Sequence, residues 1–548
     1  MAANHTLDLG LLDELRGLES FRRSYSSSQG TSALDPQDPD VQRMIEVLAY
    51  SAVRTRHAVM RNLSATWRRL LGGYFQSLLH PLAAMGMLEA QVTARMTEPV
   101  YLPAGSELQV QCADGFLATF TTLSALRVLP LSLDRCELLR GGVGYRLVLT
   151  FSSRIPRSEP PGRLRLGIHY LDDYLAALTV HQQLQKHLQR AFVVYDQPVH
   201  DRSDGPSCPI HFGTFYDEPY EADDRNPLTA VRSFLHFPQQ ELMIHAAIPA
   251  SPRPFMRMSL CLDLDAEYPR SPALYREIFR PFTVPMVALR KAPAQPIDCD
   301  GTQDSYPIRF VHPDQSYALH SVTGVYEIGD DGLVPIPPTT LSNKAPSFEL
   351  EQESDAQGST HRAALIVRMP KALLQPVRIS VDGIWHQPSL GEHLSGRLSV
   401  SLRDRSMLGV ELSTLGPIRR GVDSQLRQDA AALLRLLSLK MKAVLDLEDL
   451  QALFSMLEAG EGGPYQGFLS RIREWQVEQT PDETVRGAGI RHIYHLLVPD
   501  VRGEEEPLWR MFCQQLEKLL DAWNYEGRAE VLRHHSRAQL PSERRNGS

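Results

Sequence analysis

Apolar positions between residues 41 and 71 recur every three, four or seven residues, which places them on one side of an α-helix at about 100° per residue. Asp40 is a suitable N-cap for this helix. Gly72 and Gly73 predict its end, because glycine is costly inside a helix and favourable just past it. The sequence therefore predicts a helix of about eight turns. Its apolar stripe consists of Val41, Met44, Ile45, Leu48, Ala52, Val59, Leu63 and Leu70.

The side opposite the stripe carries arginines, spaced by eleven, seven and seven residues: Arg43, Arg54, Arg61 and Arg68. One interpretation is that the stripe packs on the protein's own core while the arginines face water, the usual position of arginine. The other is that so long a helix, preceding any compact domain, packs in a bundle with other chains. The pattern alone leaves both open.

The pattern changes along the rest of the chain. Residues 7–23 predict a short amphipathic helix, and a Ser-, Asp- and Pro-rich linker connects it to the long helix. Strand-length alternating segments separated by Gly and Pro begin at Leu88 and continue, with inserted helices, past residue 400. Gly332–Thr360 lacks periodicity and predicts a long loop, whereas the tail is again largely helical.

These elements predict an α+β fold class: an elongated multi-domain protein with a long N-terminal helix, several β-rich, sandwich-like domains with inserted helices, and a C-terminal helical region. The expected segments are 1–85 (helical, bundle-forming), 86–200 (β-rich with a helix), 201–410 (β-rich, with the loop 332–360) and 411–548 (helical and α+β).

Composition bounds the class of protein. The 548 residues are 43% hydrophobic and 22% charged, typical of a globular protein with a real core. The formal net charge of −8 gives no overall attraction to nucleic acid or an anionic membrane. Six cysteines without a CxxC pair indicate reduced thiols. Neither a signal-peptide pattern nor an apolar run of the ~18–20 residues that a membrane span needs is present, so we expect a cytoplasmic protein.

Catalytic and metal-binding patterns are weak. The sequence has no phosphate-binding glycine loop, zinc-protease motif or serine-hydrolase motif. The neighbours Asp172 and Asp173 point in different directions, so we interpret them as helix-start acids rather than an acid/base pair. Asp298, Asp300 and Asp304 lack the distal glutamate of a calcium loop, which favours a solvated turn.

Two close histidine pairs were considered as metal ligands: His181 with His187, and His492 with His495. Six residues apart on a helix is a poor spacing for joint ligation. The second pair lies in a strand-like segment, and no cysteine or carboxylate joins it. We therefore interpret all four as structural histidines, and expect neither a metal nor a cofactor.

Five segments together resemble a known family. They are DPDVQRMIEVLAYSAVRTRHAV, LPAGSELQV with FLATFTTLSALRVLPL, AVRSFLHFPQQELMIHAAI, the block from PFTVPMVALRK to SYALHSVTGVYEI, and LLRLLSLKMKAVLDLEDLQALFSML. In this order they resemble TssF (also called ImpG or VasA), the baseplate wedge component of type VI secretion. The family's Pro-His-Tyr-Leu element is reduced to residues 80–84, and Lys440 and Met441 replace its late asparagine, as in a divergent member.

The resemblance implies a non-enzymatic scaffold in which two TssF copies embrace one TssG and meet TssK, TssE and the VgrG hub. It also implies an intermolecular helical bundle at the N-terminus, and a cytoplasmic baseplate docked through partners to the inner-membrane complex. The expected partner-binding residues are Val41, Ile45, Leu48, Ala52, Val59, Leu63 and Trp67, with Arg43, Arg54, Arg61 and Arg68.

Two alternatives come from other functional classes. One is a β-sandwich hydrolase or binding enzyme, whose site would gather His, Asp and Ser side chains from distant segments. The other is a secreted effector. A pocket of converging polar groups would favour the first, and release into the medium would favour the second.

Overall fold

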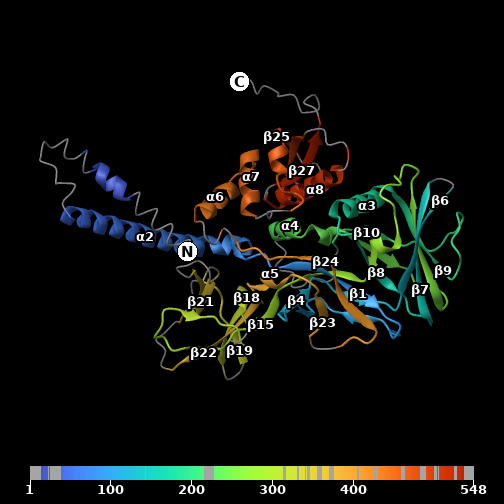
Figure 1. Cartoon of the computed structure of the whole chain (residues 1–548), viewed down its shortest axis with the longest axis horizontal. Helices are drawn as coiled ribbons and strands as arrows, with labels where there is room; N and C mark the ends of the chain where they lie inside the picture. The colour runs from blue at the N-terminus through green and yellow to red at the C-terminus, as the bar shows by residue number, and fades with distance from the viewer. Residues whose placement is uncertain are drawn as a thin grey trace. The chain divides into compact units, whose positions relative to one another are not determined.

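The computed structural model describes residues 14–21, 24, 39–141, 144–214, 227–312, 316–329, 332–339, 341, 346–354, 361–369, 375–403, 406–424, 426, 430–457, 463–481, 489–498, 503, 505–523 and 527–535 (Figure 1). Contacts divide the chain into two units, each assembled from three stretches. Unit 1 comprises Met1–Leu79, Lys291–Trp385 and Leu426–Leu437, and unit 2 comprises His80–Arg290, His386–Gln425 and Ser438–Ser548. The units cut across the four consecutive segments expected from the sequence, and that division stays a prediction.

Unit 1 begins with helical residues 14–21 and the helix α2 (Pro39–Leu79), which lie beside one another (Figure 1). At 41 residues α2 is longer than expected, because it continues through Gly72 and Gly73. Each glycine costs about 1 kcal/mol relative to alanine, an amount that tertiary packing can override. Leu78 and Leu79 are only 1% and 8% exposed, so burial holds the last turn in place. The expected end at Gly72 was wrong, and the expected linker lies outside the described residues.

The rest of unit 1 contains two sheets around one apolar core. The first is formed by β15 (Arg290–Pro293), β22 (Val377–His386), β18 (Ala318–Gly329), β19 (Gly332–Pro335) and β16 (Ile297–Cys299). The second is formed by β17 (Tyr306–Pro307), β21 (His361–Arg368) and β20 (Ser347–Ser354). In the core Trp385 is 1% exposed, and its indole Nε1 donates to the carbonyl oxygen of Ala292 at 2.8 Å.

The loop expected over Gly332–Thr360 is wrong in part, because β19 and β20 lie within it. β20 has the sequence SFELEQES, in which Phe348 and Leu350 alternate with polar residues and pack against the core. Its antiparallel pairing with β21 joins Phe348 to Val367 and Leu350 to Leu365. The strand is short and highly charged, and this obscures its period of two in the sequence.

Unit 2 contains a closed six-stranded barrel. Its strands in order are β1 (Met85–Val92), β14 (Thr283–Val287), β4 (Leu117–Thr122), β3 (Glu107–Gln111), β23 (Ser399–Leu402) and β24 (Val410–Arg419). β1 pairs antiparallel with both β14 and β24, so it joins segments about 200 and 325 residues further along the chain. Leu88, Val110, Phe120 and Val284 are completely buried and supply the core expected of a small barrel.

Further sheets of unit 2 follow the same antiparallel plan. One sheet has the order β6 (Ser132–Arg140), β7 (Tyr145–Arg157), β12 (Phe255–Leu264) and β9 (Leu188–Tyr195). Another has the order β10 (Ile210–Phe212), β11 (Met243–Ile248), β8 (Gly162–Ile168) and β13 (Phe279–Pro281). A small pair joins β2 (Val100–Leu102) to β5 (Leu126–Val128), and the inserted helices are α3 (Tyr174–His187), α4 (Pro227–His236) and α5 (Leu390–His393).

The C-terminal part of unit 2 has three strands and a crossover helix. β25 (Glu474–Pro481) pairs antiparallel with β26 (Ile490–Leu497), which pairs parallel with β27 (Gly527–His534). Helix α8 (Glu506–Trp523) makes the parallel connection, as such pairing requires. The expected break near Lys442 to Asp446 is confirmed: α6 (Ala430–Lys440), whose residues up to Leu437 belong to unit 1, ends before it, and α7 (Leu447–Met456) begins after it with Asp446 as its cap. None of the described helices is apolar over a membrane-spanning length.

Two buried histidines of unit 2 each donate or accept at one ring nitrogen only. His181 Nε2 lies 3.3 Å from the Met243 carbonyl oxygen, and His236 Nε2 lies 3.2 Å from that of Ala83. Their Nδ1 atoms are buried and find no hydrogen-bond partner among the residues that the structure describes. Burial lowers the pKa of each to about 4, so both imidazoles are neutral at neutral pH.

Acid is therefore expected to destabilise unit 2. Between pH 6.5 and 4 these histidines become protonated in the unfolded chain, whereas His181 and His236 stay neutral in the folded protein. The free energy of unfolding therefore falls as the pH falls. The loss is about 1.4 kcal/mol per pH unit for each histidine. Urea unfolding of His181→Gln between pH 7 and 5 should show a pH slope reduced by about one proton. A slope equal to the parent's would contradict the assignment, and His236→Gln provides an independent repeat.

Candidate protein-binding surface on the long helix

The apolar stripe of α2 is covered along one edge only. Ala49 and Val53, which were not assigned to the stripe, are 0% and 9% exposed. Residues nearer the centre of the stripe are open to solvent: Met44, Leu48, Val59 and Leu63 are 63, 54, 57 and 46% exposed. An isolated exposed leucine is ordinary, but a line of four on one helix side marks an interaction surface. Packing within the chain thus buries the residues at the edge of the stripe but leaves the residues at its centre exposed.

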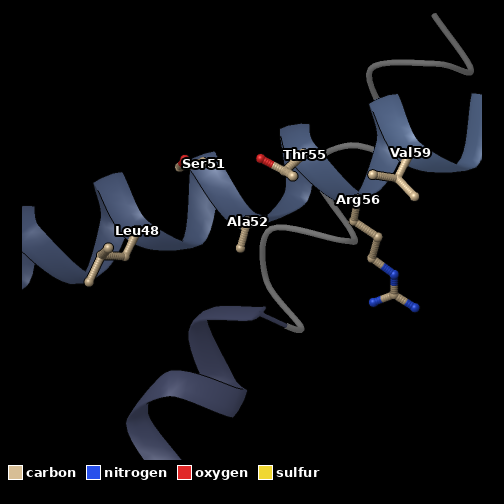
Figure 2. A pocket seen from close by; sticks show the side chains of 6 residues that line it. All are labelled: Leu48, Ser51, Ala52, Thr55, Arg56 and Val59. Atoms are coloured by element: carbon tan, nitrogen blue, oxygen red, sulfur yellow. The ribbon is translucent and has the colours of Figure 1, made fainter. Parts of the chain in front are cut away.

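A shallow groove runs along this line. It is lined by Leu48, Ser51, Ala52, Thr55, Arg56 and Val59 (Figure 2). In Figure 2 the side chains of Leu48, Ala52 and Arg56 point to the same side of α2, toward a short N-terminal helical piece. Ser51, Ala52 and Thr55 are small, so another helix can approach closely at this point. The groove is open and is bordered mainly by small and apolar side chains.

The predicted site residues differ in how the structure places them along α2. The structure brings Leu48, Ala52 and Val59 together in the groove and leaves Leu63 exposed further along α2. Val41 and Ile45 are half-buried, and Arg43 and Arg54 are exposed. The side chains of Arg61, Trp67 and Arg68 lie outside the described part of the structure.

Sequence reasoning missed Ser51, Thr55 and Arg56. Ser51 and Thr55 lie three and seven residues after Leu48, a spacing that would have found them had small residues been counted with the apolar ones. Arg56 Nη1 pairs with Glu14 Oε1 at 3.4 Å, which ties helical residues 14–21 to α2. Both partners are substantially solvated, so the pair contributes at most about 1 kcal/mol.

The acidic pairs singled out in the sequence have local roles. Asp173 caps α3, its carboxylate accepting from the backbone N–H of Ala176 at 3.1 Å. Asp300 accepts from the backbone N–H of Thr302 at 3.0 Å and from the hydroxyl of Tyr306 at 3.1 Å, as in a solvated turn. Among the described residues, no group of three or more His, Cys, Asp or Glu could hold a metal ion.

The histidine pairs are separated by the fold. His181 and His187 are both buried on α3 with different partners, and His187 Nδ1 lies 2.8 Å from Asp265 Oδ1. His492 and His495 lie on β26, as expected from a strand-like segment. His495 Nδ1 lies 2.9 Å from Nε2 of His534, a contact between neighbouring strands that local sequence does not reveal. The interpretation of these four residues as structural histidines stays a prediction.

The described residues form a multi-domain α+β protein with an exposed apolar stripe on its long helix α2. The family model described as type VI secretion system, TssF matches residues 20–364, more than half of the chain. The chain therefore belongs to the TssF family. The resemblance to this family that the sequence suggested is thus confirmed. It depended on the order of several segments, because no single segment is a specific motif.

Solved structures support the same fold. A chain of the cryo-electron microscopy structure of a type VI secretion TssK–TssF–TssG baseplate subcomplex is similar, with 15% identity and a TM-score of 0.72. That match covers 90% of this chain and 96% of the other. A chain of a type VI secretion baseplate complex has 14% identity and a TM-score of 0.61, with 96% of each chain covered. No curated protein sequence matches closely enough to count as a relative.

Leu48 and Val53 should lose different amounts of stability when each is replaced by aspartate. Leu48→Asp should change the free energy of unfolding by no more than about 0.5 kcal/mol, because Leu48 is 54% exposed. Val53→Asp should cost about 2–4 kcal/mol, because it buries an unpaired carboxylate. Denaturant unfolding followed by circular dichroism checks both. Equal losses would show that Leu48 is covered by the chain itself.

Proposed function

We propose that this chain is a structural component of the type VI secretion baseplate wedge and acts through protein contacts. Membership of the TssF family and the baseplate fold support this role. The observation that carries the molecular proposal is the exposed apolar stripe of α2 beside a covered edge. On this proposal the stripe becomes the core of an intermolecular helical bundle.

Partners follow from the matched assembly. The similar subcomplex contains TssK and TssG, so we propose that homologues of both bind this chain. A second copy of the chain, TssE and the VgrG hub complete the wedge proposed from the family resemblance. The cytoplasmic location and docking to the inner-membrane complex through partners belong to the same proposal.

The energetics of the stripe favour a helical partner with several contacts. Covering the exposed parts of Met44, Leu48, Val59 and Leu63 would contribute roughly 3–7 kcal/mol, at about 1.5–3 kcal/mol per fully buried side chain. Association costs about 4–15 kcal/mol in lost freedom of motion. These four side chains alone cannot drive tight binding, so a bundle must use more of the 41-residue helix.

The arginine side is proposed to orient the bundle. Arg43 and Arg54 lie away from the groove and are exposed. Charges at the edge of an interface affect association rate and partner choice more than affinity. We propose no catalytic step, and the enzyme and effector alternatives find no support in the described clusters of polar residues. Turnover lost on one point change, or release into the medium, would favour those alternatives.

The bundle proposal predicts the loss of one specific interaction. Leu48→Asp, or Ile45→Asp, should leave the β-rich parts folded and abolish co-purification with TssG, because a carboxylate would be buried in the bundle core. Size-exclusion chromatography with mass measurement, on the chain alone and with TssG, provides the readout. The parent chain should form a defined hetero-complex.

Val47 supplies the matched control. It is 66% exposed on the same helix but lies outside the groove, so Val47→Asp introduces the same charge without entering the bundle core. That variant should retain TssG. Retention of TssG by Leu48→Asp would remove the stripe from the interface, and loss of TssG by both variants would point to a general effect of charge on α2.

A further inference from the structure

The charges along most of α2 are of one sign. From Val47 to Leu79 its sequence contains five arginines and neither aspartate nor glutamate. These arginines are Arg54, Arg56, Arg61, Arg68 and Arg69. The whole chain has a formal net charge of −8, so this segment is opposite in sign to the protein that carries it. A basic helix on an acidic protein indicates a partner of complementary charge.

Helical residues 14–21 show how an acidic helix can lie against α2. Glu14, Leu15 and Leu18 are half-buried, whereas the remaining residues of this piece are exposed. Their spacing of three and four places these residues on one side of the piece. That side faces α2, because Glu14 Oε1 lies 3.4 Å from Arg56 Nη1. The chain thus already carries one short helix with leucines and a carboxylate beside α2.

Arg56 connects this contact to the open groove. Its side chain lines the groove and remains 71% exposed despite the pair with Glu14. In Figure 2 it extends to the same side of α2 as Leu48 and Ala52. The contact with Glu14 is made by Nη1, and a guanidinium carries five N–H donors. A second carboxylate can therefore bind Arg56 from the side of the groove.

Two other occupants fit the groove less well. A second copy of α2 would bring two arginine-rich helices together, and like charges at an interface oppose binding. An anionic membrane would be bound through large apolar side chains. The groove instead contains Ser51, Ala52 and Thr55, whose small side chains let the backbone of another helix approach closely.

We propose that the groove on α2 receives an acidic amphipathic helix from a different protein. The apolar side of that helix packs on Leu48 and Val59, and a carboxylate at its edge pairs with Arg56. The other arginines of α2 attract the acidic helix through their combined field. This inference rests on the proposed function, in which the stripe of α2 is an interface, and adds the chemistry of the partner.

Two synthetic helices test the proposal on the full chain. One is about five heptads long, with leucine at the two inward positions of each heptad and glutamate at the flanking positions. The other has lysine in place of glutamate. Fluorescence anisotropy at about 0.1 M salt should show at least tenfold tighter binding of the glutamate peptide, and the difference should shrink at about 1 M salt.

The net charge of the chain makes this comparison stringent. A charge of −8 favours the lysine peptide over the protein as a whole, so a preference for glutamate reports the basic helix. Equal affinities, a preference for lysine, or no binding of the glutamate peptide would overturn the proposal.

Arg56→Glu should weaken binding of the glutamate peptide at least fivefold, because it places a like charge at the edge of the groove. Glu14→Gln is the matched control, since it breaks the same ion pair but keeps the guanidinium. This control should bind the peptide as tightly as the parent chain. An equal loss in both variants would show that the position of residues 14–21, and not the charge of Arg56, controls binding, and the proposal would fall.

The other occupants predict different results. A dimer of the free chain that Leu48→Asp dissociates would show that a second α2 fills the groove. Co-sedimentation of the parent chain, but not of Leu48→Asp, with vesicles of phosphatidylserine and phosphatidylcholine would assign the stripe to a membrane. Either result would overturn the proposal. The peptide measurements do not involve TssG, so a chain that binds the glutamate peptide but fails to co-purify with TssG would contradict the proposed function alone.

Discussion

The uneven burial of α2 is the constraint on which the proposed assembly of this protein depends. Ala49 and Val53 are buried, whereas Leu48 and Val59, one step around the same helix, are about half exposed. Helices in water are stabilised mainly by packing of an apolar face rather than by intrinsic propensity. A 41-residue helix with that face partly open is consequently in a lower free-energy state when another polypeptide covers it.

The barrel of unit 2 is built on the opposite principle. β1 pairs with β14 on one side and with β24 on the other, so the ring closes and leaves no free strand edge. Its interior side chains, among them Leu88 and Phe120, are completely buried. This part of the chain satisfies its own apolar and backbone groups without a partner.

Local periodicity made much of this fold predictable. The stripe of α2, the strand carrying His492 and His495, and the α7 cap at Asp446 each depend on neighbours within a few residues. Errors arose where distant packing decides: buried Leu78 and Leu79 carry α2 past its glycines, and the apolar core recruits the charged strand β20. The contact between His495 and His534 was invisible for the same reason, because it joins neighbouring strands across 39 residues of the chain.

The two sides of α2 differ in chemistry, and therefore in what each can determine in the proposed bundle. An apolar stripe such as that of Leu48 and Val59 gives affinity but little direction, because burial of apolar area is insensitive to orientation. Exposed charges such as those of Arg43 and Arg54 add little affinity when solvated, but they discriminate between partners by the sign of the charge they meet. A chain that joined its neighbours through the stripe alone would bind helices in several registers, and the arginine side would select among them.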